Sequence, residues 1–106
     1  MLQLTPTQLV HHLQSSAVKP FLLDVREPSE YKICAMDDSI NVPLARIPEA
    51  IGHFDPKQEY VLICHHGVRS QHAGAFMAAQ GFEKLINLVG GIEAWACDID
   101  PGMARY

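Results

Sequence analysis

Cys64 is the residue of this chain whose type and setting could support nucleophilic chemistry. It follows the apolar run Tyr60-Val61-Leu62-Ile63 and precedes the short segment His65-His66-Gly67-Val68-Arg69-Ser70. A cysteine attacks through its thiolate, which is favoured near a helix N-terminus and beside cations. Here a glycine permits a tight loop of inward-pointing amides, and the arginine and the protonated histidines would supply positive charge. The pattern predicts a reactive Cys64, although a cysteine that ends an apolar strand is often only a small buried core residue.

Two flanking elements must place Cys64 at the edge of a sheet. Residues 60–64 are typical of a buried strand. Residues 70–80 form the clearest helical pattern, with Ala73, Phe76 and Met77 on one face and Gly81 at the expected C-cap. A strand that leads through a short loop into a helix delivers Cys64 to the carboxyl edge of the sheet, where open α/β folds bind ligands.

Strands and helices alternate along the rest of the chain. We expect strands at 2–4, 21–25, 39–42 and 84–88, and helices at 6–14, just after Pro28, at 44–52 with a break at Pro48, and at 92–97. This alternation predicts an α/β fold with a parallel sheet and helices on both of its faces. The length of 106 residues suits a single domain over residues 1–106.

Composition excludes several classes of function. The net charge of −4 and the scattered Lys and Arg residues give no footprint for nucleic acid. No apolar stretch is long enough to span a membrane, and the N-terminus lacks the pattern of a signal peptide, so we expect a cytoplasmic protein. Cys34, Cys64 and Cys97 are widely spaced, and His65 and His66 have no distant Cys/His partners. We therefore expect no disulfide framework, no metal site and no cofactor.

Four segments in this order resemble the rhodanese-like domain family, and in particular its small bacterial single-domain sulfurtransferases. They are Leu23-Asp24-Val25-Arg26-Glu27-Pro28-Ser29-Glu30-Tyr31, Ser39-Ile40-Asn41-Val42-Pro43-Leu44, the loop from Cys64 to Ser70, and Gly90-Gly91-Ile92-Glu93-Ala94-Trp95. The similarity extends over nearly the whole chain. It implies a rhodanese α/β fold with a five-stranded, mostly parallel sheet.

The resemblance also implies a mechanism and partners. Cys64 would attack a sulfane sulfur donor, such as thiosulfate or a persulfide, and hold the sulfur as its own persulfide. The amides of the active-site loop, His65, His66, Gly67, Val68, Arg69 and Ser70, would stabilise that sulfur. Cyanide, a cellular thiol or a sulfur-relay protein would accept it, in a ping-pong scheme. Asp24 and Arg26 would support the loop, whereas their residue types alone are equally consistent with a surface ion pair.

Two alternatives stay open on the sequence. Related folds place a cysteine and an arginine around a phosphate or arsenate with five intervening residues, whereas four separate Cys64 from Arg69 here. The shorter loop favours a single sulfur atom over an oxyanion. A non-catalytic binding module is the second alternative, but inactive relatives commonly lack the cysteine. The segment Cys34-Ala35-Met36-Asp37-Asp38-Ser39 lacks the glycines and histidine that many relatives carry there, so its turn and the role of Cys34 are unexplained.

Overall fold

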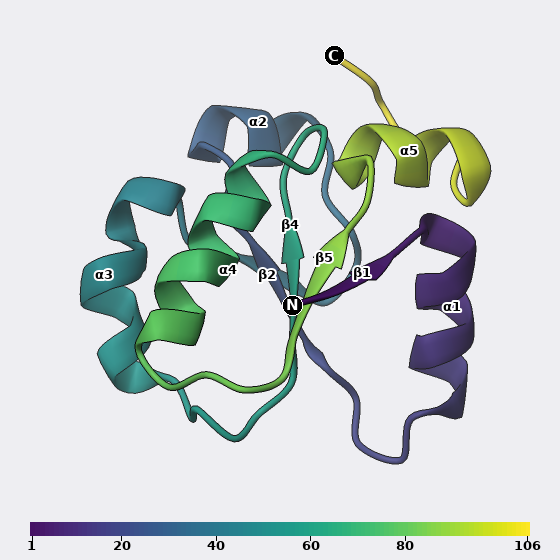
Figure 1. Ribbon diagram of the computed structural model, residues 1–106. Helices are drawn as coiled ribbons and strands as arrows, with labels where there is room; N and C mark the ends of the chain where they lie inside the picture. Colours follow the sequence, from purple (N-terminus) through teal and green to yellow (C-terminus); the bar gives the residue numbers. More distant parts are fainter.

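A computed structural model describes residues 1–106 and shows a five-stranded sheet with helices on both faces (Figure 1). The strands are β1 (Leu2–Leu4), β2 (Phe21–Asp24), β3 (Ser39–Asn41), β4 (Tyr60–Ile63) and β5 (Leu85–Leu88). Their order across the sheet is β1-β5-β4-β2-β3, and every neighbouring pair is parallel. The predicted α/β architecture is confirmed, and the sheet is entirely parallel rather than mostly so.

Strand β4 lies at the centre of the sheet, and all four of its residues are buried. It pairs with β2 on one side, where Ile63 lies opposite Asp24, and with β5 on the other, where Leu62 lies opposite Asn87. A strand buried on both faces reads as a continuous apolar run, which explains why its sequence alone identified it. The residue that follows it, Cys64, therefore leaves the middle of the carboxyl edge.

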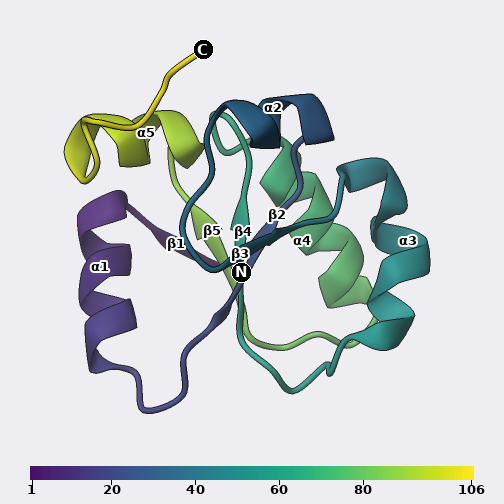
Figure 2. The ribbon, with the colours of Figure 1, turned by 180° about the vertical axis from the view of Figure 1, so that it is seen from behind.

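The helices form two layers (Figure 2). Helices α1 (Pro6–Ser15) and α5 (Gly91–Asp98) cover one face, while α3 (Ile47–Ala50) and α4 (Arg69–Ala79) cover the other. Helix α1 begins as predicted with a capping box, since the Thr5 amide donates to the Gln8 side chain at 2.9 Å. Each layer has its own core cluster, and Cys64 belongs to the cluster under α4. Helix α2 (Pro28–Ile33) has no buried residue and lies near the carboxyl edge.

The segment 44–52 differs from the predicted single helix with a break at Pro48. It consists of the 3-10 turn η1 (Leu44–Arg46), the one-turn helix α3 and the 3-10 turn η2 (Ile51–His53). Pro48 lies in the first turn of α3, where a helix needs no amide donor, so the proline begins a helix instead of interrupting one.

The unusual segment 34–39 keeps a tight turn without glycine. Asp38 adopts a left-handed conformation with φ of 64°, which aspartate tolerates better than most residues. The Ser39 hydroxyl donates to the Met36 carbonyl at 2.6 Å, and the Tyr31 hydroxyl donates to the Ser39 carbonyl at 2.6 Å. The local turn that the missing glycines had put in question is thus held by side-chain hydrogen bonds.

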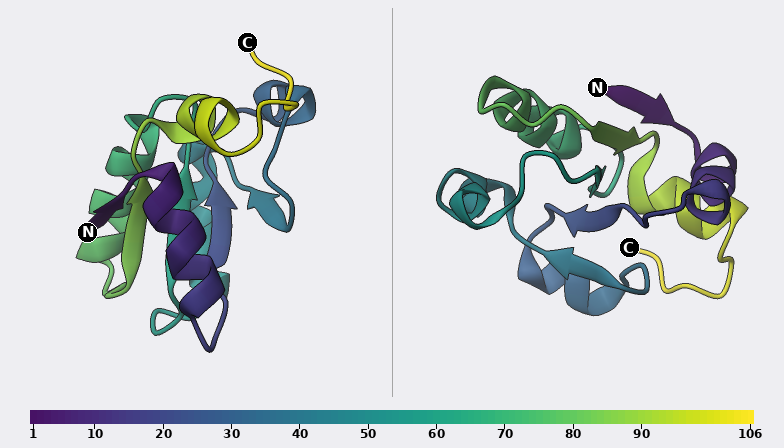
Figure 3. Two further views of the ribbon diagram at one scale, coloured as in Figure 1. Left: turned by 90° about the vertical axis from the view of Figure 1, so that its right-hand side faces the viewer. Right: turned by 90° about the horizontal axis from the view of Figure 1, so that it is seen from below.

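The C-terminal segment after α5 returns toward α2 at the carboxyl edge of the sheet (Figure 3). Its last residue, Tyr106, donates a hydrogen bond to Glu30 of α2 at 2.8 Å. None of the helices combines the length and the hydropathy needed to cross a bilayer.

Candidate active site

Cys64 is almost fully buried at the end of β4, with 1% of its surface exposed. Its Sγ accepts a hydrogen bond from the Gly67 amide at 2.9 Å. Gly67 has φ of 94°, a conformation that glycine adopts without the steric penalty of a side chain. The loop therefore curls back over the sulfur, as the spacing of Cys64 and Gly67 predicted.

The remaining amides of the loop are free to bind a ligand. Those of His65, His66, Val68, Arg69 and Ser70 donate to no group of the protein. Helix α4 starts immediately after Val68, and no side chain caps it. Uncapped amides at a helix N-terminus attract negative charge, so the loop can stabilise an anionic sulfur beyond Cys64.

The first turn of helix α5 is hydrogen-bonded to the backbone of the loop. The Ile92 amide donates to the Cys64 carbonyl at 2.8 Å, and the Glu93 amide donates to the His65 carbonyl at 3.1 Å. A Cβ atom on Gly91 would lie 2.4 Å from the Cys64 carbonyl oxygen, so only glycine permits this approach. The contact explains Gly91, the second of the paired glycines and the first residue of α5, which the sequence offered only as part of the segment from Gly90 to Trp95.

A buried polar chain extends from Cys64 to the edge strand β1. Ser70 Oγ lies 3.4 Å from Cys64 Sγ and donates to Asn87 Oδ1, and Asn87 donates to Gln3 Oε1 at 2.8 Å. Asn87 is 1% exposed and was not predicted as a site residue. Its signal was a single amide inside an otherwise apolar strand, because buried polar side chains in strands need partners.

Arg69 was predicted to be the cation beside Cys64. In the structure its guanidinium forms an ion pair with Glu30 of α2. Its two terminal nitrogens bind the two carboxylate oxygens of Glu30, at 2.5 Å and 2.8 Å. The hydrogen bonds from Arg69, acting against partial burial, lower the pKa of Glu30 to about 2. The same pair raises the pKa of Arg69, so both groups stay charged at neutral pH. Sequence reasoning missed Glu30 because 39 residues separate it from Arg69.

Asp24 and Arg26 form a buried ion pair, so the surface alternative is wrong. Both side chains are 0% exposed, and Arg26 Nη2 lies 2.7 Å from Asp24 Oδ2. The guanidinium also donates to the Cys34 carbonyl at 2.7 Å and to the Tyr106 hydroxyl at 3.0 Å. Burial opposes its charge, but the hydrogen bonds to Asp24 and Tyr106 outweigh it and raise the pKa of Arg26. Neither residue bonds the loop directly; they connect to it through Tyr106 and Glu30.

Two histidine rings of the loop and the Tyr106 ring form a stack. The His65 ring lies 3.9 Å from that of His66 on one side and 3.9 Å from that of Tyr106 on the other. Burial, and then the neighbouring His66, lower the pKa of His65, which disfavours the protonated form of this ring. Its Nε2 atom is buried and has no hydrogen-bond partner. The lowered pKa works against the positive charge that His65 was predicted to contribute when protonated.

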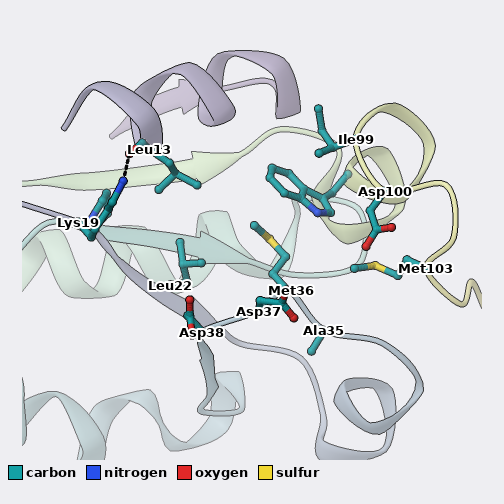
Figure 4. A pocket seen from close by; sticks show the side chains of 12 residues that line it. Leu13, Lys19, Leu22, Ala35, Met36, Asp37, Asp38, Ile99, Asp100 and Met103 are labelled. Carbon is teal, nitrogen blue, oxygen red and sulfur yellow. Dashed lines mark hydrogen bonds between the residues drawn. The ribbon is translucent and has the colours of Figure 1, made fainter.

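An apolar hollow of about 530 Å³ lies away from Cys64, between α1, α5 and the segment 35–38 (Figure 4). Leu22, Met36 and Trp95 line it, together with the acidic residues Asp38 and Asp100. No residue from Cys64 to Ser70 lines it, so it forms no part of the candidate active site.

Comparison with known proteins gives consistent matches. Residues 5–98 match the family model described as the rhodanese-like domain. The chain is 35% identical over 81 residues to the putative sulfurtransferase YtwF of Bacillus subtilis, covering 76% of this chain and 78% of that protein. It is 29% identical over 92 residues to the thiosulfate sulfurtransferase GlpE of Shewanella oneidensis, covering 87% and 89%. The crystal structure of the single-domain sulfurtransferase RDL2 of Saccharomyces cerevisiae has a TM-score of 0.78 and 26% identity, with 98% and 95% covered.

Some relatives are much longer than this chain. The adenylyltransferase and sulfurtransferase MOCS3 of Arabidopsis thaliana is 31% identical over 101 residues, which are 80% of this chain but only 22% of that protein. The part of such relatives that lies outside the match has no counterpart in the residues described here.

Proposed function

Because the chain belongs to the rhodanese-like domain family, we propose that it is a sulfurtransferase that carries sulfane sulfur as a persulfide on Cys64. The observation that carries the proposal is the loop around Sγ. One amide, that of Gly67, binds the sulfur at 2.9 Å, and five further amides of the loop have no partner in the protein. Such donors stabilise negative charge that develops on sulfur during transfer.

The proposed reaction has two transfer steps. The Cys64 thiolate attacks the outer sulfur of the donor, the sulfur–sulfur bond of the donor breaks, and the remainder leaves with the bonding electrons. The persulfide sulfur then sits among the free amides of His65 to Ser70. An acceptor such as cyanide or a thiolate attacks this outer sulfur and releases the Cys64 thiolate, so no electron is gained or lost overall.

Supporting roles follow from the contacts of the surrounding residues. Ser70, which donates to Asn87, would position the Cys64 sulfur. Gly91 allows α5 to approach the backbone of the loop closely. Asp24 and Arg26 support the site indirectly, since Arg26 binds Tyr106 and Tyr106 binds Glu30. We propose no metal and no cofactor, because sulfur exchange between thiolates needs neither.

Sulfur-relay proteins are proposed as partners besides small molecules. The putative sulfur carrier protein YrkF of Bacillus subtilis is 36% identical to this chain over 74 residues. MOCS3 of Arabidopsis thaliana is described as both an adenylyltransferase and a sulfurtransferase. These relatives support an exchange of sulfur with another protein. We further propose that the reaction is cytoplasmic and that residues 1–106 act as one rhodanese-like domain.

Phosphatase chemistry has weaker support. A phosphatase would need its loop arginine to bind the phosphoryl oxygens, yet both terminal nitrogens of Arg69 bind Glu30. With four residues between Cys64 and Arg69, the loop is also one residue shorter than the phosphatase pattern.

The test is sulfur transfer to cyanide, measured as thiocyanate, with thiosulfate and with an alkyl persulfide as alternative donors. Cys64→Ser should abolish transfer from both donors, because serine cannot form a persulfide. Cys34→Ser and Cys97→Ser are matched controls and should keep most of the activity. Transfer by the Cys64→Ser variant at the wild-type rate would refute the proposal, and a wild-type protein without any transfer would favour a binding module.

A further inference from the structure

The active-site loop contains one permanent cation, and a carboxylate cancels it. Arg69 is the only Lys or Arg between His65 and Ser70. Glu30 of α2 binds both of its terminal nitrogens, at 2.5 Å and 2.8 Å. The Tyr106 hydroxyl donates to the same carboxylate at 2.8 Å and holds it in place. In such a bidentate ion pair the carboxylate neutralises the guanidinium, so Arg69 attracts a further anion only weakly.

No other arginine supplies the missing charge. Arg26 binds Asp24 in the interior, Arg105 binds Glu93, and Arg46 lies 3.8 Å from Glu49 on the surface. Three of the lysines, Lys19, Lys57 and Lys84, precede strands β2, β4 and β5 and lie toward the opposite edge of the sheet. Lys32, exposed on α2, is the only lysine at the carboxyl edge.

The rest of the loop is neutral or apolar. Burial lowers the pKa of His65 and so disfavours a positive charge on its ring. Val68 at the tip of the loop is 64% exposed and presents an apolar surface. The whole chain carries a net charge of −4, which repels small anions at longer range.

The two classes of sulfane sulfur donor differ in the negative charge that they bring to Cys64. Attack on thiosulfate brings a thiolate and a dianion together: Cys64–S⁻ and S–SO₃²⁻ give Cys64–S–S⁻ and SO₃²⁻, with a total charge of −3 throughout. Attack on an alkyl persulfide anion carries less: Cys64–S⁻ and R–S–S⁻ give Cys64–S–S⁻ and R–S⁻, with a total charge of −2 throughout. Free cations near the thiolate matter more for the first reaction than for the second.

We propose that Glu30 is a specificity-determining residue, which neutralises Arg69 and so disfavours dianionic donors such as thiosulfate relative to persulfides. This inference rests on the proposed function and assigns a donor preference to the same site. Glu30 acts through Arg69 and does not touch the reacting sulfur. Removing its charge would leave the guanidinium free beside the loop, where an anionic donor approaches.

The experiment compares kcat/KM for thiosulfate, a dianion, and for an alkyl persulfide with an uncharged alkyl group, a monoanion, with cyanide as the acceptor, in wild type and two variants. Glu30→Gln should raise the ratio of thiosulfate to persulfide by about tenfold, a change well within the energy of one unpaired charge at close range. Glu27→Gln removes the same charge from an exposed position on the same segment and should leave the ratio unchanged. The effect of Glu30→Gln should shrink as salt is added, because screening weakens the freed charge.

A second variant keeps the test valid if Glu30→Gln folds poorly. Arg69→Gln leaves Glu30 as an unpaired anion and should lower the ratio of thiosulfate to persulfide below that of wild type. An unchanged ratio in both variants, or an equal shift in Glu27→Gln, would overturn the role of Glu30. Absence of transfer from either donor in wild type would instead overturn the proposed function, so the two failures are distinguishable.

Discussion

At the scale of single residues, Cys64 is defined by groups that come from four parts of the chain. The Gly67 amide donates a hydrogen bond to its sulfur, and the Ser70 hydroxyl lies 3.4 Å from that sulfur. Asn87 in turn accepts a hydrogen bond from the Ser70 hydroxyl. The Ile92 amide binds the Cys64 carbonyl. The sequence indicated the first two of these because they lie within six residues of the cysteine. The other two depend on how β5 and α5 pack, which local spacing does not show.

Tyr106 shields His65, and a variant can measure this shielding. Its ring stacks on that of His65 at 3.9 Å, and burial is the main cause of the lowered pKa of His65. Tyr106→Ala should admit water and raise the pKa of His65 toward its ordinary value, as followed by NMR titration of the ring protons. Tyr106→Phe keeps the ring and should leave this pKa low. An unchanged pKa in the alanine variant would show that Tyr106 does not bury His65.

At the scale of elements, the contact between α5 and the loop depends on one glycine. Gly91 has φ of 62°, and a Cβ there would lie 2.4 Å from the Cys64 carbonyl oxygen. We expect Gly91→Ala to lower the free energy of unfolding by about 2 kcal/mol or more, from the left-handed conformation and the clash together. Displacement of the loop by about 1 Å should lower kcat/KM by about a hundredfold.

Gly52→Ala is the matched control for that substitution. A Cβ on Gly52 meets no atom within 4 Å, and its backbone is not left-handed. Urea unfolding and sulfur transfer should therefore match wild type closely. Equal effects of the two substitutions would mean that α5 does not hold the loop.

The pair Glu30–Arg69 connects α2 to the start of α4 and makes stability depend on pH. The pKa of Glu30 is about 2 in the folded protein, below the ordinary value of 4.5. Its stabilising contribution is therefore complete above pH 4.5 and is lost as the pH falls through about 2. The difference in free energy of unfolding between wild type and Glu30→Gln should shrink over this window in urea titrations. A difference that stays constant from pH 5 to pH 2 would contradict the assignment.

Elements were more predictable than the contacts between them. All five strands were predicted, and β2, β4 and β5 were the clearest because inner strands of a parallel sheet are buried on both faces and read as apolar runs. The edge strands β1 and β3 contain no buried residue and give a weaker pattern. The helices α1 and α4 were predicted from a capping box and an apolar face, and their ends differ by about one residue. The segment 44–52 was predicted less well, since Pro48 begins α3 instead of breaking a longer helix. Proline is compatible with either arrangement in the sequence, and in the structure it lies in the first turn of α3 next to the buried Ile47.

At the scale of the whole molecule, a buried ion pair joins the sheet to both flanking segments of the site. Arg26 binds Asp24 of β2, the Cys34 carbonyl after α2 and the Tyr106 hydroxyl of the C-terminal segment. The sequence places Asp24 and Arg26 at the end of a strand, a position that suits a surface pair equally well. Asp24 lies between the paired strands β3 and β4, and Arg26 contacts the Cys34 carbonyl and Tyr106, so their burial depends on distant segments that no local pattern predicts.

Global stability should therefore depend strongly on Asp24. Asp24→Ala leaves Arg26 as an uncompensated buried charge and should lower the free energy of unfolding by about 3–5 kcal/mol. The exposed pair Arg46–Glu49 is the control, and Glu49→Ala should change stability by about 1 kcal/mol or less. Urea unfolding measures both. A loss for Asp24→Ala no larger than that for Glu49→Ala would mean that the buried pair contributes little.

The most direct test of sulfur transfer by this molecule is the mass of Cys64 after exposure to a donor. The purified protein is incubated with an alkyl persulfide, freed of excess reagent, blocked with an alkylating agent and digested for mass spectrometry. We predict one added sulfur atom on the peptide that contains Cys64 and none on those that contain Cys34 or Cys97. Subsequent cyanide should remove that sulfur as thiocyanate. Added sulfur spread equally over all three cysteines, or none on Cys64, would contradict a persulfide carried at this site.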